Sequence, residues 1–411
     1  MAAVFYLLCL YFTFKAYKCL SNNQKIIVFG WYLFATIGLF VYTNYLIKIG
    51  WEYGIPGADM LNYFKAGIAL NNGDSWRDLA TISPIYFAQL KLGTLMYFIF
   101  SSFVSILLRI PIINYQGSLY FIYSAFLLLN ILSSINVSRI LSQGKIKSRY
   151  LYTTLFCFGL IFASYRLLRD TILFYLITVA ILYMKNHNTR TKDKVISILM
   201  MCACVIMRPY ALFIVFPYFI VNFSKSKRSI LYVVLIPIIL VTVNGIFSSV
   251  LPYFNVTWDL SSFDIHEMIN FLLFPNIFSQ AKLLLIWNMV PHYSDYVAGC
   301  NLPGMYYAMS LWNFIVYPLV LFGIVYKLKD RIWDKCFWIS ILVSVCAVYS
   351  ILYSTESGLE TRHKIMILIP LVYFAGEGIE LLSKIKISRY KISTFYPLIM
   401  LFAAIGVFFI C

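Results

Sequence analysis

Long apolar stretches alternate with short polar stretches along almost the whole chain. A membrane-spanning helix needs about 20 mostly apolar residues. Stretches that approach this length predict helices near residues 3–18, 26–48, 117–138, 150–166, 170–185, 194–208, 210–223, 229–248, 305–326, 336–353, 364–383 and 394–410. We therefore expect an all-α, polytopic integral membrane protein with about 12 transmembrane helices, because spanning segments must satisfy their own backbone hydrogen bonds.

The polar stretches between these segments are rich in Lys and Arg. Cytoplasmic loops of membrane proteins carry an excess of these residues. The basic stretches lie at residues 15–25, 139–149, 185–194, 225–228, 327–335 and 384–391. Placing all of them in the cytoplasm leaves two long external regions, 49–116 and 249–304, within a single transmembrane domain of residues 1–411.

Segment 85–110 is also apolar enough to span a membrane. The chain must be outside before it and inside by residue 139, and segment 117–138 already supplies that crossing. We therefore expect 85–110 to be a re-entrant or interfacial helix in the outer leaflet. A wrongly assigned basic loop is the alternative. Amphipathic patterns at 58–70, 262–273 and 277–290 predict further short helices on the membrane surface.

The composition changes this picture little. The formal net charge is +17, but most of it lies at predicted helix ends, where it faces anionic lipid headgroups, so we expect no nucleic-acid partner. The nine Cys lack metal-ligand spacing, and the chain has no Walker motif or nucleotide-binding glycine fingerprint. These observations predict no metal and no cofactor.

A carboxylate opens the first external region. Asp59 begins a helical pattern, and Tyr63 follows one turn later on the same face. Asp59 fits the N-cap of that helix, where its side chain would accept backbone N–H bonds. It also fits a base at the membrane–water boundary, where partial desolvation raises a carboxyl pKa.

A second candidate is the external turn between segments 150–166 and 170–185. It carries Arg166 and Arg169 three residues apart, followed by Asp170. Arg169 and Asp170 fit a plain ion pair, yet Arg166 leaves the turn with an excess positive charge. The guanidinium fork suits phosphate, so the turn also fits binding of a lipid-linked phosphate or diphosphate.

Two further external turns hold charge beside apolar segments, where charge is costly and is usually kept for function. Arg208 precedes Pro209 and Tyr210, and it fits either a snorkelling residue or an anion ligand. The last turn carries Glu360, Arg362 and His363. Arg362 fits an anion ligand, and His363 fits either a general acid/base or a solvated helix start. Aromatic and acidic residues of 258–296 fit sugar stacking or an interfacial aromatic belt equally.

The order of these features resembles that of O-antigen and exopolysaccharide polymerases. Two N-terminal apolar segments around a basic loop precede the Gly-Ala-Asp run at 57–59 and Tyr63. The turns at Arg169 and Arg208, and Arg362 before the last segments, also fit. The chain departs from many of those relatives in having no His near Arg208.

The same loop is similar to that of membrane glycosyltransferases of the C-type fold, which use polyprenyl-phosphate sugar donors. Those enzymes often carry an acidic pair in the loop, where this chain has Ala58 and Asp59. That difference leaves the use of a metal open in this second interpretation. In this second interpretation the enzyme moves one sugar to a lipid or glycan acceptor.

The polymerase resemblance implies a bacterial inner-membrane enzyme of lipopolysaccharide or other surface-polysaccharide biosynthesis, with its active site facing the periplasm. The substrate would be an undecaprenyl-diphosphate-linked oligosaccharide, and a chain-length regulator is a possible partner. Asp59, Arg169 and Arg362 would be catalytic. Substrate binding would fall to Tyr63, Arg166, Asp170, Arg208, Tyr210, Glu360 and His363. A lipid-linked oligosaccharide flippase is the alternative from another class, although flippases usually carry charge through the middle of their helices.

Overall fold

The structure is a computed structural model that describes residues 1–55, 58–74, 92–110, 114–167, 169–185, 191–207, 211, 214–215, 217–218, 303–354, 367–387, 390–391 and 396. The helices are α1 (Ala2–Tyr17), α2 (Asn22–Lys48), the 3-10 turn η1 (Glu52–Gly54), α3 (Ala58–Asn71), α6 (Leu92–Leu108), α7 (Tyr115–Leu141), α8 (Ser148–Leu155), α9 (Phe158–Ser164), α10 (Arg169–Lys185), α11 (Thr191–Met207), α16 (Pro303–Lys329), α17 (Lys335–Ser354) and α18 (Leu368–Lys384). The described part is therefore all-helical, apart from a two-residue ladder of β1 (Lys386–Ile387) and β2 (Tyr390–Lys391).

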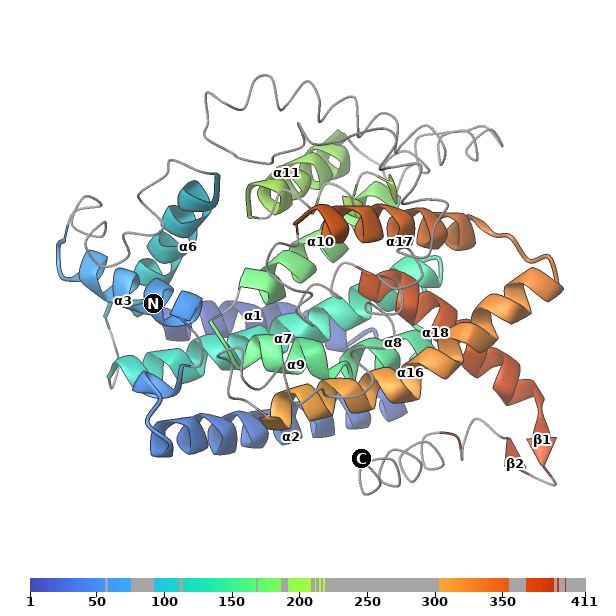
Figure 1. Cartoon of the computed structure of the whole chain (residues 1–411), viewed down its shortest axis with the longest axis horizontal. Helices are drawn as coiled ribbons and strands as arrows, with labels where there is room; N and C mark the ends of the chain where they lie inside the picture. Colours follow the sequence, from blue (N-terminus) through green and yellow to red (C-terminus); the bar gives the residue numbers. More distant parts are fainter. Residues whose placement is uncertain are drawn as a thin grey trace.

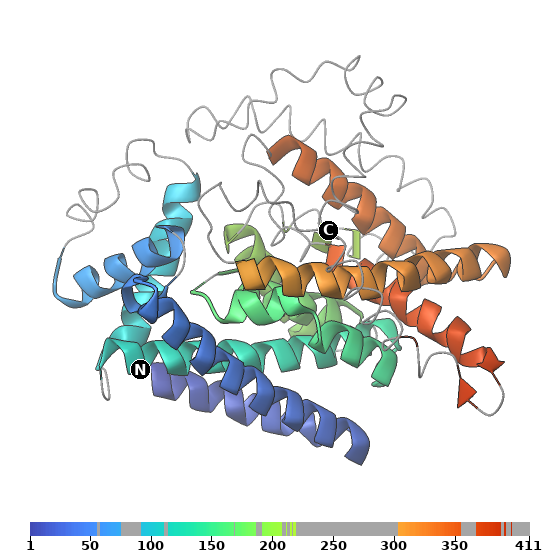
Figure 2. The same cartoon turned by 60° about the horizontal axis from the view of Figure 1, so that its bottom comes forward.

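Most of the apolar segments expected to be helices are helices. The predicted segments at 3–18, 26–48 and 117–138 coincide with α1, α2 and α7, which run alongside one another (Figures 1 and 2). Segments 170–185 and 194–208 coincide with α10 and α11, and the three segments between 305 and 383 with α16, α17 and α18. Segments 229–248, 262–273 and 277–290 lie outside the described residues, as do nearly all of 210–223 and 394–410.

The predicted single helix at 150–166 is instead two short helices, α8 and α9. The backbone of Cys157 is extended, with ψ 100°, and this interrupts the helix. The hydroxyls of Thr153 and Thr154 donate to the carbonyl oxygens of Arg149 and Tyr150, four residues earlier. Hydroxyls that bond back in this way commonly bend helices, and here they lie just before the break.

The described part of the region predicted to be the first external one contains a compact pair of helices, α3 and α6. The ring centroids of Tyr63 in α3 and Phe100 in α6 are 4.9 Å apart. One turn further along both helices, a β-carbon on Gly67 would lie 2.7 Å from the side chain of Val104. Asn71 then donates to the carbonyl oxygen of Leu108 at 3.4 Å. The predicted surface helix at 58–70 is therefore a helix, but it packs closely on α6.

Two helices of the described part, α2 and α7, are long and apolar enough to cross a membrane. They differ in environment, because α7 is mostly buried among other helices whereas α2 is mostly uncovered. Large apolar side chains project from the uncovered faces of α1 and α2, including Leu7, Phe29, Phe34, Ile37 and Val41. Water-soluble monomers rarely expose so continuous an apolar surface, so this face fits contact with lipid.

Four basic loops gather at one end of the bundle, which we call the basic end and define by loops 15–25, 139–149, 327–335 and 384–391. Gln24 donates to the hydroxyl of Ser148 at 3.0 Å and so joins the first two loops. Lys384 donates to the hydroxyl of Tyr326 at 2.6 Å and so joins the last two. Arg149 reaches Glu377 at 3.0 Å and connects these two pairs. Helices α3 and α6 and the start of α7 lie away from the basic end.

Candidate functional site

The turn between α9 and α10 lies in the interior of the bundle, away from the basic end. Tyr165 is buried, and its hydroxyl donates to the carbonyl oxygen of Ala35 in α2 at 2.5 Å. The ring can approach α2 because residue 38 is glycine, where a β-carbon would lie 2.8 Å from the Tyr165 hydroxyl oxygen. The turn is thereby fixed between α2 and α7.

The charged residues of this turn, which the sequence placed in an external loop, are largely buried. Arg166 is only 7% exposed and interacts electrostatically with the hydroxyl of Tyr123 in α7. Asp170 is 2% exposed and lies in the first turn of α10, where the helix dipole favours a carboxylate. Arg169 is half-buried at the start of the same helix. The turn thus holds two guanidinium groups and one carboxylate among packed helices.

Buried hydroxyls surround the turn. Within the described part of the chain, the hydroxyls of Tyr123 and Thr171 are buried and make no hydrogen bond. Nearby, Asn130 of α7 donates to the Ser164 hydroxyl at 2.6 Å and to the Leu160 carbonyl oxygen at 2.9 Å. Unsatisfied buried hydroxyls are uncommon in proteins, so they mark a place where a polar ligand could bind.

The structure places Asp59 and Tyr63 together on α3. The helix begins at Ala58, so Asp59 lies inside its first turn rather than at the residue before it, where an N-cap would stand. Tyr63 is buried against Phe100, as described above, and in this conformation it is a packing residue. Its proposed contact with substrate stays a prediction.

The remaining predicted site residues, Arg208, Tyr210, Glu360, Arg362 and His363, lie outside the described residues. Of the predicted cationic clamp, Arg166 and Arg169 are therefore the members that the structure describes. Among the described residues, no group of His, Cys, Asp and Glu could hold a metal ion.

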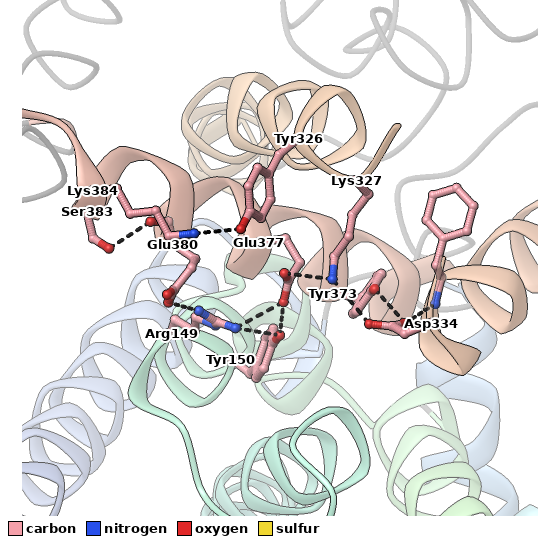
Figure 3. A network of polar contacts seen from close by, with 11 residues as sticks. Arg149, Tyr150, Tyr326, Lys327, Asp334, Tyr373, Glu377, Glu380, Ser383 and Lys384 are labelled. Atoms are coloured by element: carbon pink, nitrogen blue, oxygen red, sulfur yellow. Dashed lines mark hydrogen bonds and ion pairs between the residues drawn. The ribbon is translucent and has the colours of Figure 1, made fainter. Parts of the chain in front are cut away.

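A second polar site, which sequence reasoning missed, lies at the basic end and is centred on Glu377 of α18. Glu377 is buried between Arg149 and Lys327, which reach its two carboxylate oxygens from opposite sides at 3.0 Å each (Figure 3). The Tyr150 hydroxyl donates to the same oxygen as Arg149, and Arg149 also pairs with Glu380. Burial disfavours the Lys327 charge, but Glu377 and Asp334 outweigh it and raise the lysine pKa above its usual value.

Asp334 extends this network to the start of α17. One carboxylate oxygen accepts from the Tyr373 hydroxyl and from the backbone N–H of Phe337, each at 2.8 Å, and the second pairs with Lys327 at 3.1 Å. Asp334 is therefore the N-cap of α17 as well as an ion-pair partner. The network ties α8, α16, α17 and α18 together.

Glycines bring these helices close enough for the network to form. A β-carbon on Gly323 of α16 would overlap the backbone carbonyl of Phe374, and one on Gly378 of α18 would overlap that of Leu319. One on Gly376 would overlap the ring of Tyr150. Small residues at helix interfaces allow such approach in membrane proteins.

A sequence signal for this network was present. Glu377 and Glu380 lie inside the apolar segment predicted at 364–383, where an acidic residue needs a partner. Their spacing of three residues places them on one helix face. The partners could not be read from the sequence, because they come from loops that are distant along the chain.

Comparisons with known proteins give no assignment: no protein-family model, no curated protein and no solved structure matches this chain.

Proposed function

We propose that the chain is a polytopic integral membrane protein with about 12 spanning helices and its basic end in the cytoplasm. The uncovered apolar faces of α1 and α2, and the length and hydropathy of α2 and α7, support a membrane environment. The gathering of four basic loops at one end supports a common side for those loops.

We further propose that it is a bacterial inner-membrane glycosyltransferase of the O-antigen-polymerase kind, which joins undecaprenyl-diphosphate-linked repeat units at the periplasmic face. The observation that carries this proposal is the burial of Arg166, which is 7% exposed and interacts electrostatically with Tyr123 of α7. A buried guanidinium in a membrane protein is costly and is usually kept for an anionic substrate or an ion pathway.

In the proposed reaction, a hydroxyl of the acceptor sugar attacks C1 of the donor sugar. The bond from C1 to the acceptor oxygen forms as the bond from C1 to the diphosphate oxygen breaks. Asp59 takes the hydroxyl proton. Arg169 and Arg166, with Arg208 and Arg362, stabilise the negative charge that develops on the leaving diphosphate, since fixed cations in a water-poor site act strongly on such charge.

The test is the surface-glycan ladder of a deletion strain complemented with wild type, Asp59→Asn, Arg166→Gln or Arg169→Ala. We expect a full ladder with wild type and a single capped repeat unit with each variant. Removal of one such donor costs about 2.7–4 kcal/mol of transition-state stabilisation, or roughly 100- to 1,000-fold in rate. Membrane protein levels are measured in parallel, because Arg166 is buried.

Arg331→Gln is the matched control, since Arg331 is an exposed arginine at the basic end. It should leave the ladder intact. Loss of one sugar from every repeat, with polymer length unchanged, would favour transfer of a single sugar instead. An unchanged glycan in the deletion strain would refute both enzymatic functions.

A further inference from the structure

The turn η1 lies at the far end of α2 from the basic end. Helix α2 begins directly after the basic loop 15–25 and has 27 residues, a length of about 40 Å at a rise of 1.5 Å per residue. The turn is therefore on the side that the proposed function assigns to the periplasm. It also leads into α3, the helix that carries Asp59.

The backbone of this turn is held against α2 in an unusual conformation. The Trp51 N–H donates to the Leu46 carbonyl oxygen at 2.9 Å. Gly54 lies so close to α2 that a β-carbon would be 2.9 Å from the Thr43 carbonyl oxygen, and its left-handed φ of +66° suits glycine. Tyr53 is also left-handed, with φ 54° and ψ 14°, although large side chains rarely adopt this conformation. Costly backbone conformations of this kind cluster at functional sites.

This conformation holds an aromatic ring at the surface of the molecule. Tyr53 is 38% exposed, and its ring centroid is 4.8 Å from that of Phe64 in α3, in an edge-to-face arrangement. Phe64 is fully buried, so it supports the Tyr53 ring from one side. A ring that is already positioned can bind a ligand with little loss of side-chain freedom. Its face carries partial negative charge, which attracts the positively polarised C–H groups of a sugar.

A carboxylate and an ammonium group accompany the ring. Glu52 precedes Tyr53, and its Oε2 lies 2.7 Å from Nζ of Lys65, the residue after Phe64. Their side chains are 49% and 42% exposed, so an acceptor and a donor face solvent beside the ring. The pair carries no net charge, which favours the hydroxyls of a neutral sugar over an acidic one. Such charged groups also make burial of this turn in lipid costly.

We propose that Tyr53 is a substrate-binding residue that stacks on a neutral sugar of the lipid-linked oligosaccharide, with Glu52 and Lys65 bonded to its hydroxyls. This inference rests on the proposed function, because it takes the substrate from it. Phe64 follows Asp59 by five residues, a rise of about 7.5 Å along α3. The ring is therefore within reach of the same oligosaccharide whose hydroxyl Asp59 would deprotonate.

The test measures polymer formation in membrane vesicles of the deletion strain that carry wild type or a variant. The probe is the lipid-linked repeat unit extracted from the deletion strain, added at increasing concentration. Loss of the apolar contact should raise KM about tenfold in Tyr53→Asn and leave kcat within about threefold. Asparagine tolerates the left-handed backbone, so this variant should stay folded, which its thermal unfolding checks. Tyr53→Phe keeps the ring and should recover most of the affinity that Tyr53→Asn loses.

Tyr45→Asn is the matched control, since Tyr45 is an exposed tyrosine near the same end of α2. It should leave KM unchanged. An equal rise in KM for Tyr45→Asn would overturn the inference, because it would indicate a general role of interfacial aromatic residues. So would a Tyr53→Asn variant with the KM of wild type, or one that loses kcat alone. In those cases wild type still forms polymer, and the proposed function stands. A deletion strain that accumulates no lipid-linked repeat unit would instead overturn the proposed function and this inference together.

Discussion

At the scale of single residues, the clearest constraint is the charge of Glu377. Its carboxylate faces two cations, Arg149 and Lys327, and both ion pairs are shielded from water. A buried ion pair adds little stability compared with well-packed apolar residues, but removal of one partner leaves the other charge buried and uncompensated. Glu377 is shared by two cations, so its loss affects both.

We therefore predict that Glu377→Gln lowers the stability of the folded protein by about 3–5 kcal/mol. The measurement is the thermal unfolding midpoint of the purified protein in detergent. Glu380→Gln is the matched control, because Glu380 also pairs with Arg149 but its side chain is 43% exposed. Exposed pairs contribute roughly 0–1 kcal/mol, so the control should melt close to wild type. Equal midpoints for the two variants would contradict the central role of Glu377.

At the residue level, charge and position along the chain indicated which charged residues share a turn, but not how deeply they are buried. The sequence indicated that Arg166, Arg169 and Asp170 form one charged turn, and the structure places Arg166 between α9 and α10 and the other two in the first turn of α10. The sequence could not indicate that Arg166 and Asp170 are buried, because their burial depends on Tyr123 and on neighbouring helices distant along the chain. The Glu377 network was missed for the same reason.

At the scale of elements, the position of the Arg166 turn depends on the contact between Tyr165 and helix α2. The tyrosine hydroxyl donates to the Ala35 carbonyl oxygen, and it fits there because Gly38 has no side chain to block it. Local sequence alone did not identify this contact, since a glycine inside an apolar helix has several possible roles. The break between α8 and α9 was likewise not predicted, because hydropathy is continuous across Phe156 and Cys157.

We predict that Gly38→Ala destabilises the protein by about 1–3 kcal/mol, because its new methyl group would crowd the Tyr165 hydroxyl. Tyr165→Phe removes that oxygen and one hydrogen bond, at a cost of about 1 kcal/mol. In the double variant the crowding is relieved, so the combined loss should be smaller than the sum of the two single losses. The measurement is thermal unfolding of all three variants.

Gly30→Ala is the control for this cycle. Gly30 lies in the same helix, and a β-carbon there would meet nothing within 4 Å. The control should be neutral or slightly stabilising, because alanine favours a helix more than glycine does. Strictly additive losses at positions 38 and 165 would show that the two residues do not share a contact.

At the scale of the whole molecule, hydropathy predicted the location of most described helices. A long apolar segment in a membrane must satisfy its own backbone hydrogen bonds, and a helix is the main structure that does so. Hydropathy predicted less well how the helices pack. The pair of α3 and α6 depends on Tyr63, Gly67 and their partners, none of which produces a strong periodic signal. The number of spanning segments and the sidedness of the loops stay predictions.

The basic end makes sidedness testable. Because Arg149, Lys327 and Glu377 are within hydrogen-bonding distance, loops 139–149 and 327–335 must lie on the same side of any membrane the chain crosses. We predict that an impermeant maleimide labels Lys145→Cys and Lys329→Cys only after cells are permeabilised, whereas it labels Asp74→Cys in intact cells. All three positions are exposed in the structure, and the native cysteines are first replaced by serine.

Labelling of Lys145→Cys and Lys329→Cys from opposite sides is incompatible with the Glu377 network. Labelling of Lys145→Cys and Lys329→Cys in intact cells, with Asp74→Cys labelled only after permeabilisation, would keep the network but invert the orientation, and it would place the Arg166 turn toward the cytoplasm, where a periplasmic polymerase could not use it.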